Sequence, residues 1–237
     1  MSALLTKPLC NKEDLGKPIP NDDHAISMCL PTWRSVVGYE ERDKEIMGSI
    51  QLGYPRFLYH PLIEKAIGEL IGDFQELKAL SHQLYPTQKT AKRAYDFILK
   101  HHPNIECIIT ETNQQAFILS YPKECEEIAK CYWQHTGEGI SSRHAKYILS
   151  NKTVPSSDKA YEAITSKISA SLDVDTDNIY LFPNGMAAIY MAMRLLQKIH
   201  PERSFSQFCF PLKLESFARN IFQPLCTHHC FDKIKLR

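Results

Sequence analysis

The residues best suited to bind a ligand form a predicted strand–turn–helix at 179–189, Ile-Tyr-Leu-Phe-Pro-Asn-Gly-Met-Ala-Ala-Ile. Gly185 allows the backbone to turn tightly and to approach a ligand, because it has no Cβ. The first amides of the helix that follows have no intrahelical acceptor and lie at the positive end of the helix dipole. A phosphate group is the natural ligand of such a site. The alternative is an ordinary Asn-Gly turn before a helix.

A second candidate pair is Tyr54 and Arg56, in the segment Gly-Tyr-Pro-Arg-Phe at 53–57. On an extended segment, residues two apart point to the same side. A tyrosine hydroxyl and the planar guanidinium of arginine could then hold a phosphate together. The alternative is a surface arginine beside a buried tyrosine.

The block Thr136-Gly-Glu-Gly-Ile-Ser-Ser-Arg143 gathers glycines, hydroxyls and an arginine. We interpret it as a turn that leads into a helix capped by serine, since caps of this kind are common. The alternative is an anion or substrate loop. Further along, Cys226-Thr-His-His-Cys230 has half of a zinc spacing, but no second pair of ligands stands out, so we predict no metal site.

Hydrophobic periodicity predicts the elements that must position these residues. Apolar residues recur every three or four positions from Leu62 to Leu80, which predicts a helix that ends before Pro86. Thr87 is a plausible cap for a second helix at 88–101. Two β-rich runs at 105–110 and 115–121 predict a hairpin. Further helices are expected at 123–133, 141–149, 157–172 and 186–197, with a short strand at 179–182.

Composition and charge exclude several classes of protein. The 237 residues include 28 basic and 27 acidic side chains, a net charge of +1, without a basic stripe, so we expect no nucleic-acid partner. No stretch approaches the roughly 18–20 apolar residues of a membrane span, and the start lacks the pattern of a secretory signal. The eight cysteines are too sparse for a disulfide scaffold. We expect a cytoplasmic protein without membrane association.

Tyr54-Pro-Arg56 upstream of Gly185-Met-Ala-Ala-Ile resembles a pairing in the Cys/Met-metabolism family of pyridoxal-phosphate-dependent enzymes. The resemblance is to the cystathionine γ-synthase-like branch, typified by fungal enzymes, and covers roughly residues 17–200. Three further blocks resemble that branch: 27–33 with 37–40, 53–57 with His60-Pro61, and Trp133-Gln-His-Thr-Gly-Glu-Gly-Ile-Ser-Ser-Arg143. The resemblance implies the α/β fold of pyridoxal-phosphate-dependent transferases (aspartate aminotransferase-like). This chain would hold a truncated part of that fold, itself helix-rich α+β.

The resemblance also implies roles for four residues. The amides of Gly185 and Met186 would bind the phosphate of pyridoxal 5'-phosphate in their own subunit, whereas Tyr54 and Arg56 would reach the phosphate of the neighbouring subunit. The active site would then be shared, and the functional unit would be a homo-oligomer. The implied reaction belongs to transsulfuration and methionine biosynthesis: γ-replacement on an activated homoserine ester by cysteine, with the cofactor as electron sink. The substrates would be small amino acids.

The family's Schiff-base lysine lies far downstream of the glycine–methionine motif, whereas this chain ends soon after Met186 and departs from the family pattern from about Phe205. We therefore expect a truncated form without this lysine that is inactive alone, as a truncated or frameshifted gene would give. The alternative is a non-catalytic remnant or a binding protein that keeps the family's N-terminal half.

The chain is accordingly predicted to have four parts. Residues 1–60 form an extended arm, because prolines at 8, 18, 20 and 31 disfavour a long helix, and the arm lies on another surface such as a second subunit. Residues 61–150 form a helix-rich α+β region with the hairpin. Residues 151–204 begin the cofactor-binding domain, and 205–237 are a divergent tail.

Overall fold

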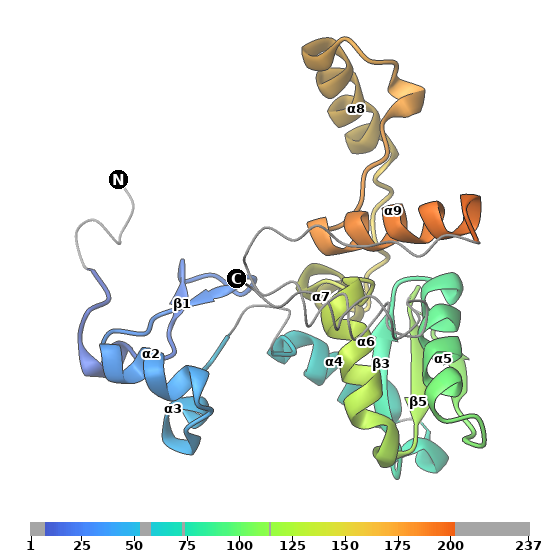
Figure 1. Cartoon of the computed structure of the whole chain (residues 1–237). Helices are drawn as coiled ribbons and strands as arrows, with labels where there is room; N and C mark the ends of the chain where they lie inside the picture. Colours follow the sequence, from blue (N-terminus) through green and yellow to red (C-terminus); the bar gives the residue numbers. More distant parts are fainter. Residues whose placement is uncertain (1–7, 53–57, 73, 114, 202–237) are drawn as a thin grey trace, which may run out of the picture.

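A computed structural model describes residues 8–52, 58–72, 74–113 and 115–201 (Figure 1). These residues are helix-rich with two small sheets. The helices are α2 (Trp33–Glu40), α3 (Lys44–Gly48), α4 (Pro61–Gly72), α5 (Gln88–His101), α6 (Glu126–Thr136), α7 (Ser142–Leu149), α8 (Asp158–Leu172) and α9 (Gly185–Ile199). The strands are β1 (Pro18–Ile19), β2 (Ser27–Met28), β3 (Ser81–Tyr85), β4 (Ile108–Glu111) and β5 (Phe117–Tyr121). Short 3₁₀ turns are η1 (Lys12–Asp14), η2 (Gln75–Leu77), η3 (Lys123–Cys125) and η4 (Thr176–Asn178).

The larger sheet has the strand order β3–β5–β4, and both pairings are antiparallel. β4 and β5 form the predicted hairpin, in which Glu111 pairs with Phe117. β3, which the sequence did not predict, pairs with β5 along its whole length, from Ser81 opposite Tyr121 to Tyr85 opposite Phe117. This places the hairpin strand β5 at the centre of the sheet.

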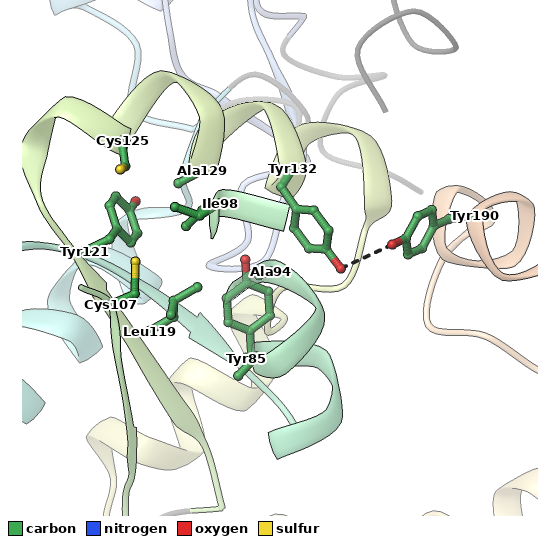
Figure 2. Close-up of a cluster of buried hydrophobic side chains, with 11 residues drawn as sticks. Tyr85, Ala94, Ile98, Cys107, Leu119, Tyr121, Cys125, Ala129, Tyr132 and Tyr190 are labelled. Atoms are coloured by element: carbon green, nitrogen blue, oxygen red, sulfur yellow. Dashed lines mark hydrogen bonds between the residues drawn. The ribbon is translucent and has the colours of Figure 1, made fainter. Parts of the chain in front are cut away.

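The sheet separates two apolar layers, because successive strand residues point to opposite faces. On one face Tyr85, Leu119 and Tyr121 pack with residues of α5 and α6 (Figure 2). On the other face Leu84 and Ile118 pack with residues of α4 and α7. The sheet region, defined as residues 61–150, therefore has helices on both sides and a core of its own.

The helix prediction after Pro61 was too long. α4 ends at Gly72, and the chain passes through η2 into β3 instead of continuing as a helix to Leu80. Leu77 is buried and Leu80 is partly buried in the same layer as α4. These side chains therefore join the core, although the residues that carry them do not belong to an α-helix. By contrast, α5 has the predicted bounds, and the Thr87 hydroxyl accepts a hydrogen bond from the Thr90 amide at 3.2 Å.

The prediction of an extended arm is wrong for much of residues 33–48, which form α2 and α3. The Thr32 side chain caps α2 by accepting from the Ser35 amide at 3.1 Å. Pro31 precedes this cap, outside the helix, where its missing N–H costs no helical hydrogen bond. The short antiparallel pair β1–β2 fits the expected extended backbone.

The prediction of a strand at 179–182 is also wrong, since these residues have no assigned helix or strand. The α8–α9 region, defined as residues 158–199, buries little: Thr165 is the one buried residue of α8, and Ala187 and Tyr190 are those of α9. In Figure 1, α8 projects away from the sheet region on the far side of α9. The division of the chain at residues 150 and 204 stays a prediction.

Candidate functional site

The first candidate feature is the N-terminus of α9, where the structure places Gly185 and Met186. Asn184 is extended, with φ −159° and ψ 166°, and its Oδ1 accepts from the Ala187 amide at 2.9 Å. Among the described residues, the amides of Gly185 and Met186 find no acceptor. A Cβ built on Gly185 would have nothing within 4 Å. The helix therefore begins with two available donors and open space beside them.

A second contact anchors this N-terminus to the loop after α6. Asn184 Nδ2 donates to the Gly137 carbonyl at 2.8 Å. Gly137 ends α6 in the left-handed conformation, with φ +66°, and a Cβ there would lie 2.3 Å from Asn184 Oδ1. Only glycine allows both this backbone conformation and this close approach. The structure thus brings the Trp133–Arg143 block and the glycine–methionine motif together.

The side chain next to this contact, Glu138, is 5% exposed and forms an ion pair with Arg93 of α5. Arg93 Nε donates to both carboxylate oxygens at 3.0 Å, and Nη2 also donates to Oε1, so two nitrogens of the guanidinium bind the carboxylate in a bidentate arrangement. Burial alone would lower the pKa of Arg93, but its hydrogen bonds and charge interaction with Glu138 raise that pKa above the ordinary value. Arg93 therefore stays charged, and its ion pair with Glu138 holds the loop after α6 against α5.

Two tyrosines extend this network to α9. The Tyr132 hydroxyl donates to Glu138 Oε2 at 2.6 Å and lies 3.5 Å from the Tyr190 hydroxyl (Figure 2). Burial raises the pKa of Tyr132, and the neighbouring Tyr190 and Glu138 raise it further, so the hydroxyl stays protonated as a donor. Sequence reasoning missed this network, because Arg93 and Glu138 are far apart in the chain and neither position shows a spacing pattern.

Tyr54 and Arg56, the other predicted phosphate ligands, lie outside the described residues. Their neighbour Tyr59 is described, and its ring stacks on the Trp133 ring with centroids 4.1 Å apart. Trp133 is the first residue of the block that meets α9. The roles predicted for Tyr54 and Arg56 stay predictions.

The remaining sequence predictions concern the helix cap, metals and membranes. Ser141 caps α7, accepting from the His144 amide at 3.1 Å, as the structural interpretation of the Thr136–Arg143 block predicted. The Cys226–Cys230 segment lies outside the described residues, and within the described part no cluster of three acidic, histidine or cysteine side chains could hold a metal. None of the helices described is long and apolar enough to cross a bilayer.

Comparisons with known proteins confirm the resemblance stated above. Residues 62–141 match the family model of the fungal trans-sulfuration enzyme N-terminal domain. The chain is 35% identical over 172 residues to a putative cystathionine gamma-synthase of Saccharomyces cerevisiae, covering 62% of this chain and 26% of that protein. It is 34% identical over 158 residues to a cystathionine gamma-synthase of Neurospora crassa, covering 56% of this chain and 25% of that protein.

The chain spans about a quarter of the length of the curated relatives it matches. No solved structure matches it. The matched residues 62–141 run from α4 to the cap of α7, so they comprise the sheet, the helices α4, α5 and α6, and Glu138, whereas α7 and the N-terminus of α9 lie outside them.

Proposed function

Because residues 62–141 match the N-terminal domain of fungal trans-sulfuration enzymes, we propose that the chain is part of a pyridoxal-phosphate-dependent transsulfuration protein. The proposed reaction is the one implied by similarity to cystathionine gamma-synthases, γ-replacement on an activated homoserine ester by cysteine. The substrates are small amino acids, and the contribution of this chain is to bind the phosphate of the cofactor.

The observation that carries this proposal is the contact between Gly137 and Asn184. It fixes the N-terminus of α9 to the loop at the end of the matched domain, at 2.8 Å between Asn184 Nδ2 and the Gly137 carbonyl. A phosphate site needs donors whose positions do not change when the ligand arrives. The contact supplies this, since it holds the Gly185 and Met186 amides in place through the residue that precedes them.

The residues present fit a phosphate group. The Asn184 side chain already satisfies the Ala187 amide, so the Gly185 and Met186 amides are left to donate to phosphate oxygens. The open space beside Gly185 admits those oxygens. When bound, pyridoxal phosphate supplies an electron sink for carbanions of the amino-acid substrate. Tyr54 and Arg56 would donate to the phosphate of a neighbouring subunit, which makes the active unit a homo-oligomer.

A non-catalytic remnant or binding protein is the second candidate function. The apolar side chains that α9 exposes favour it, because a surface of this kind is suited to a protein partner. They are Ile189, Leu195, Leu196 and Ile199. Borohydride reduction in saturating cofactor tests catalysis by this chain: a pyridoxyl adduct on one lysine in the intact mass supports the enzyme, and no adduct excludes catalysis by this chain alone.

Binding of pyridoxal phosphate to the full chain, followed by fluorescence, tests the phosphate site through Gly185→Pro. Proline is tolerated at the first helical position, and the extended Asn184 before it suits a residue that precedes proline. The substitution removes one amide donor but leaves the helix. Loss of one hydrogen bond to a charged group costs about 1.5–3 kcal/mol, so we expect affinity about tenfold weaker or more.

Gly185→Ala is the matched control, because alanine keeps the amide and its Cβ meets no described atom. We expect the alanine variant to bind more tightly than the proline variant, with equal helix content in both by circular dichroism. Equal affinity of the two variants, or no binding by the unmodified chain, would contradict the phosphate site.

A further inference from the structure

A pocket of about 320 Å³ lies between the N-terminal arm and α7. Its volume falls at the lower end of the roughly 300–1,000 Å³ typical of small-ligand pockets. It is lined by His24, Arg143, Lys146, Tyr147, Ser150 and Lys152. None of these residues belongs to the site proposed for the cofactor phosphate, so the pocket is a separate feature.

The lining residues converge because of helical spacing and a turn. Lys146 and Tyr147 are three and four positions after Arg143, which places these three residues on one face of α7, and Ser150 is the C-cap residue of the helix. Asn151, with φ +50°, turns the chain back, and the Lys152 amide donates to the Tyr147 carbonyl at 3.0 Å. This bond returns Lys152 to the face that carries Arg143.

The opposite wall of the pocket comes from the arm. His24 Nδ1 lies 3.0 Å from Ser142 Oγ, and Lys146 Nζ lies 2.8 Å from Asp23 Oδ2. These two contacts join residues more than 100 positions apart, and they fix the turn between β1 and β2 against α7. The pocket is therefore formed by tertiary structure and not by α7 alone.

The lining is strongly cationic. It contains three permanent positive charges, a histidine and no carboxylate. Lys146 is paired with Asp23 at the surface. Within the described ranges of the chain, Arg143 and Lys152 form no ion pair. Two positive charges are thus available to a ligand.

The stability of α7 does not explain these charges. Arg143 lies in the first turn of α7, near the positive end of the helix dipole, where a cation is unfavourable. It is also three positions before Lys146, a spacing at which like charges repel. An anion bound between them would remove both unfavourable interactions.

We propose that this pocket binds a small dicarboxylate. Arg143 is in the first turn of α7 and Lys152 is three residues beyond its last residue, so the two available charges come from the two ends of this helix. Two separated carboxylates match this arrangement better than one compact phosphate. The Arg143 guanidinium takes one carboxylate with its planar fork, Lys152 takes the other, and the Tyr147 ring contacts the carbon chain between them.

Titration of the full chain with glutarate at low ionic strength, followed by calorimetry, tests the proposal. Arg143→Gln and Lys152→Gln should each weaken binding about tenfold, the cost of one charge-assisted hydrogen bond. Arg143→Lys should also weaken it, because lysine lacks the fork. Lys89→Gln, which removes an equal charge from an exposed position on α5, is the matched control and should bind as the unmodified chain does.

Acetate and inorganic phosphate distinguish a dicarboxylate site from a general anion surface. Both should bind at least tenfold more weakly than glutarate, since neither can reach Arg143 and Lys152 together. Phosphate binding as tight as glutarate binding would overturn the proposal, as would an equal effect of Lys89→Gln or no heat of binding with glutarate. Affinity for pyridoxal phosphate should be unchanged in the Arg143 and Lys152 variants. The dicarboxylate site and the phosphate site are therefore tested independently of each other.

Discussion

The sheet region, residues 61–150, and the α8–α9 region differ in how much apolar surface they bury. Ile98, Ile118 and Leu119 of the sheet region are fully buried between helices and strands. In the α8–α9 region, Leu172 is 67% exposed and Leu195 57% exposed. Most helical stability in proteins comes from packing of an apolar face. The sheet region has that packing within itself, whereas the α8–α9 region has much less of it.

The difference follows the match to known proteins. The residues that match the trans-sulfuration domain model, 62–141, lie within the sheet region and leave out only α7 and the residues at its edges. The exposed apolar residues of α8 and α9 lie outside that match. Their surface is suited to contact further protein, and we expect the two regions to respond differently to the same kind of substitution.

The largest expected difference is between Leu119→Ala and Leu195→Ala. Leu119 has no exposed surface and lies on the central strand, so truncation leaves a cavity and lowers the free energy of unfolding by about 2–5 kcal/mol. Leu195→Ala changes it by about 0.5 kcal/mol or less, because the side chain is already in water. Urea denaturation of both variants measures this. Equal losses would mean that α9 is as well packed as the sheet.

The ion pair of Glu138 and Arg93 should come next in size. Glu138→Ala leaves Arg93 without its carboxylate and Tyr132 without its acceptor. Because the Arg93 side chain is 22% exposed, we expect a loss of about 2–3 kcal/mol, below that of a fully buried pair.

Asp96→Ala is the matched control for Glu138→Ala, since both partners of the Lys92–Asp96 pair are 57% exposed. It should change stability by less than about 1 kcal/mol. The same urea denaturation measures both variants. A loss for Asp96→Ala as large as that for Glu138→Ala would contradict the importance of burial here.

A smaller effect is expected from Asn184→Ala, which removes the cap of α9 and the bond to Gly137. A lost cap costs about 1 kcal/mol. Because α9 packs on the sheet region through few buried residues, the loss should appear as faster amide hydrogen exchange in α9. Exchange in α5 and β5 should not change. Thr87→Ala, which removes the cap of α5, should instead lower the global stability by a similar amount.

The smallest expected effect is a pH dependence of the sheet region through His82 of β3. Burial lowers the pKa of His82 below its ordinary value near 6.5. The folded state then binds fewer protons than the unfolded state, so stability is full above about pH 6.5 and falls as the pH drops through the folded pKa. Thermal unfolding of His82→Gln should depend less on pH between 7 and 5 than unfolding of the unmodified chain. An identical dependence would exclude His82 as the source.

Much of the local structure could be predicted from the sequence, because it depends on neighbours in the chain. Thr87 and the spacing of apolar residues after it define α5, and the Glu111–Asn113 turn defines the hairpin. The predictions failed where a distant partner was needed. The sequence of β3, which contains His82 and Gln83, does not predict a strand, yet β3 pairs with β5 along its whole length. The sequence of residues 179–182 predicts a strand, but these residues do not form one.

The same distinction between local patterns and distant contacts applies to the candidate site. Local patterns in the sequence identified a turn at Gly185 before a helix from Met186, Ser141 as a cap, and the resemblance to transsulfuration enzymes, because turns, caps and motifs are local. Only the tertiary structure showed that Gly137 contacts Asn184, that Glu138 is paired with Arg93, and that Arg143 shares a pocket with Lys152 and His24. These contacts join residues from different helices, and their energies depend on burial and distance, which the order of residues along the chain does not contain.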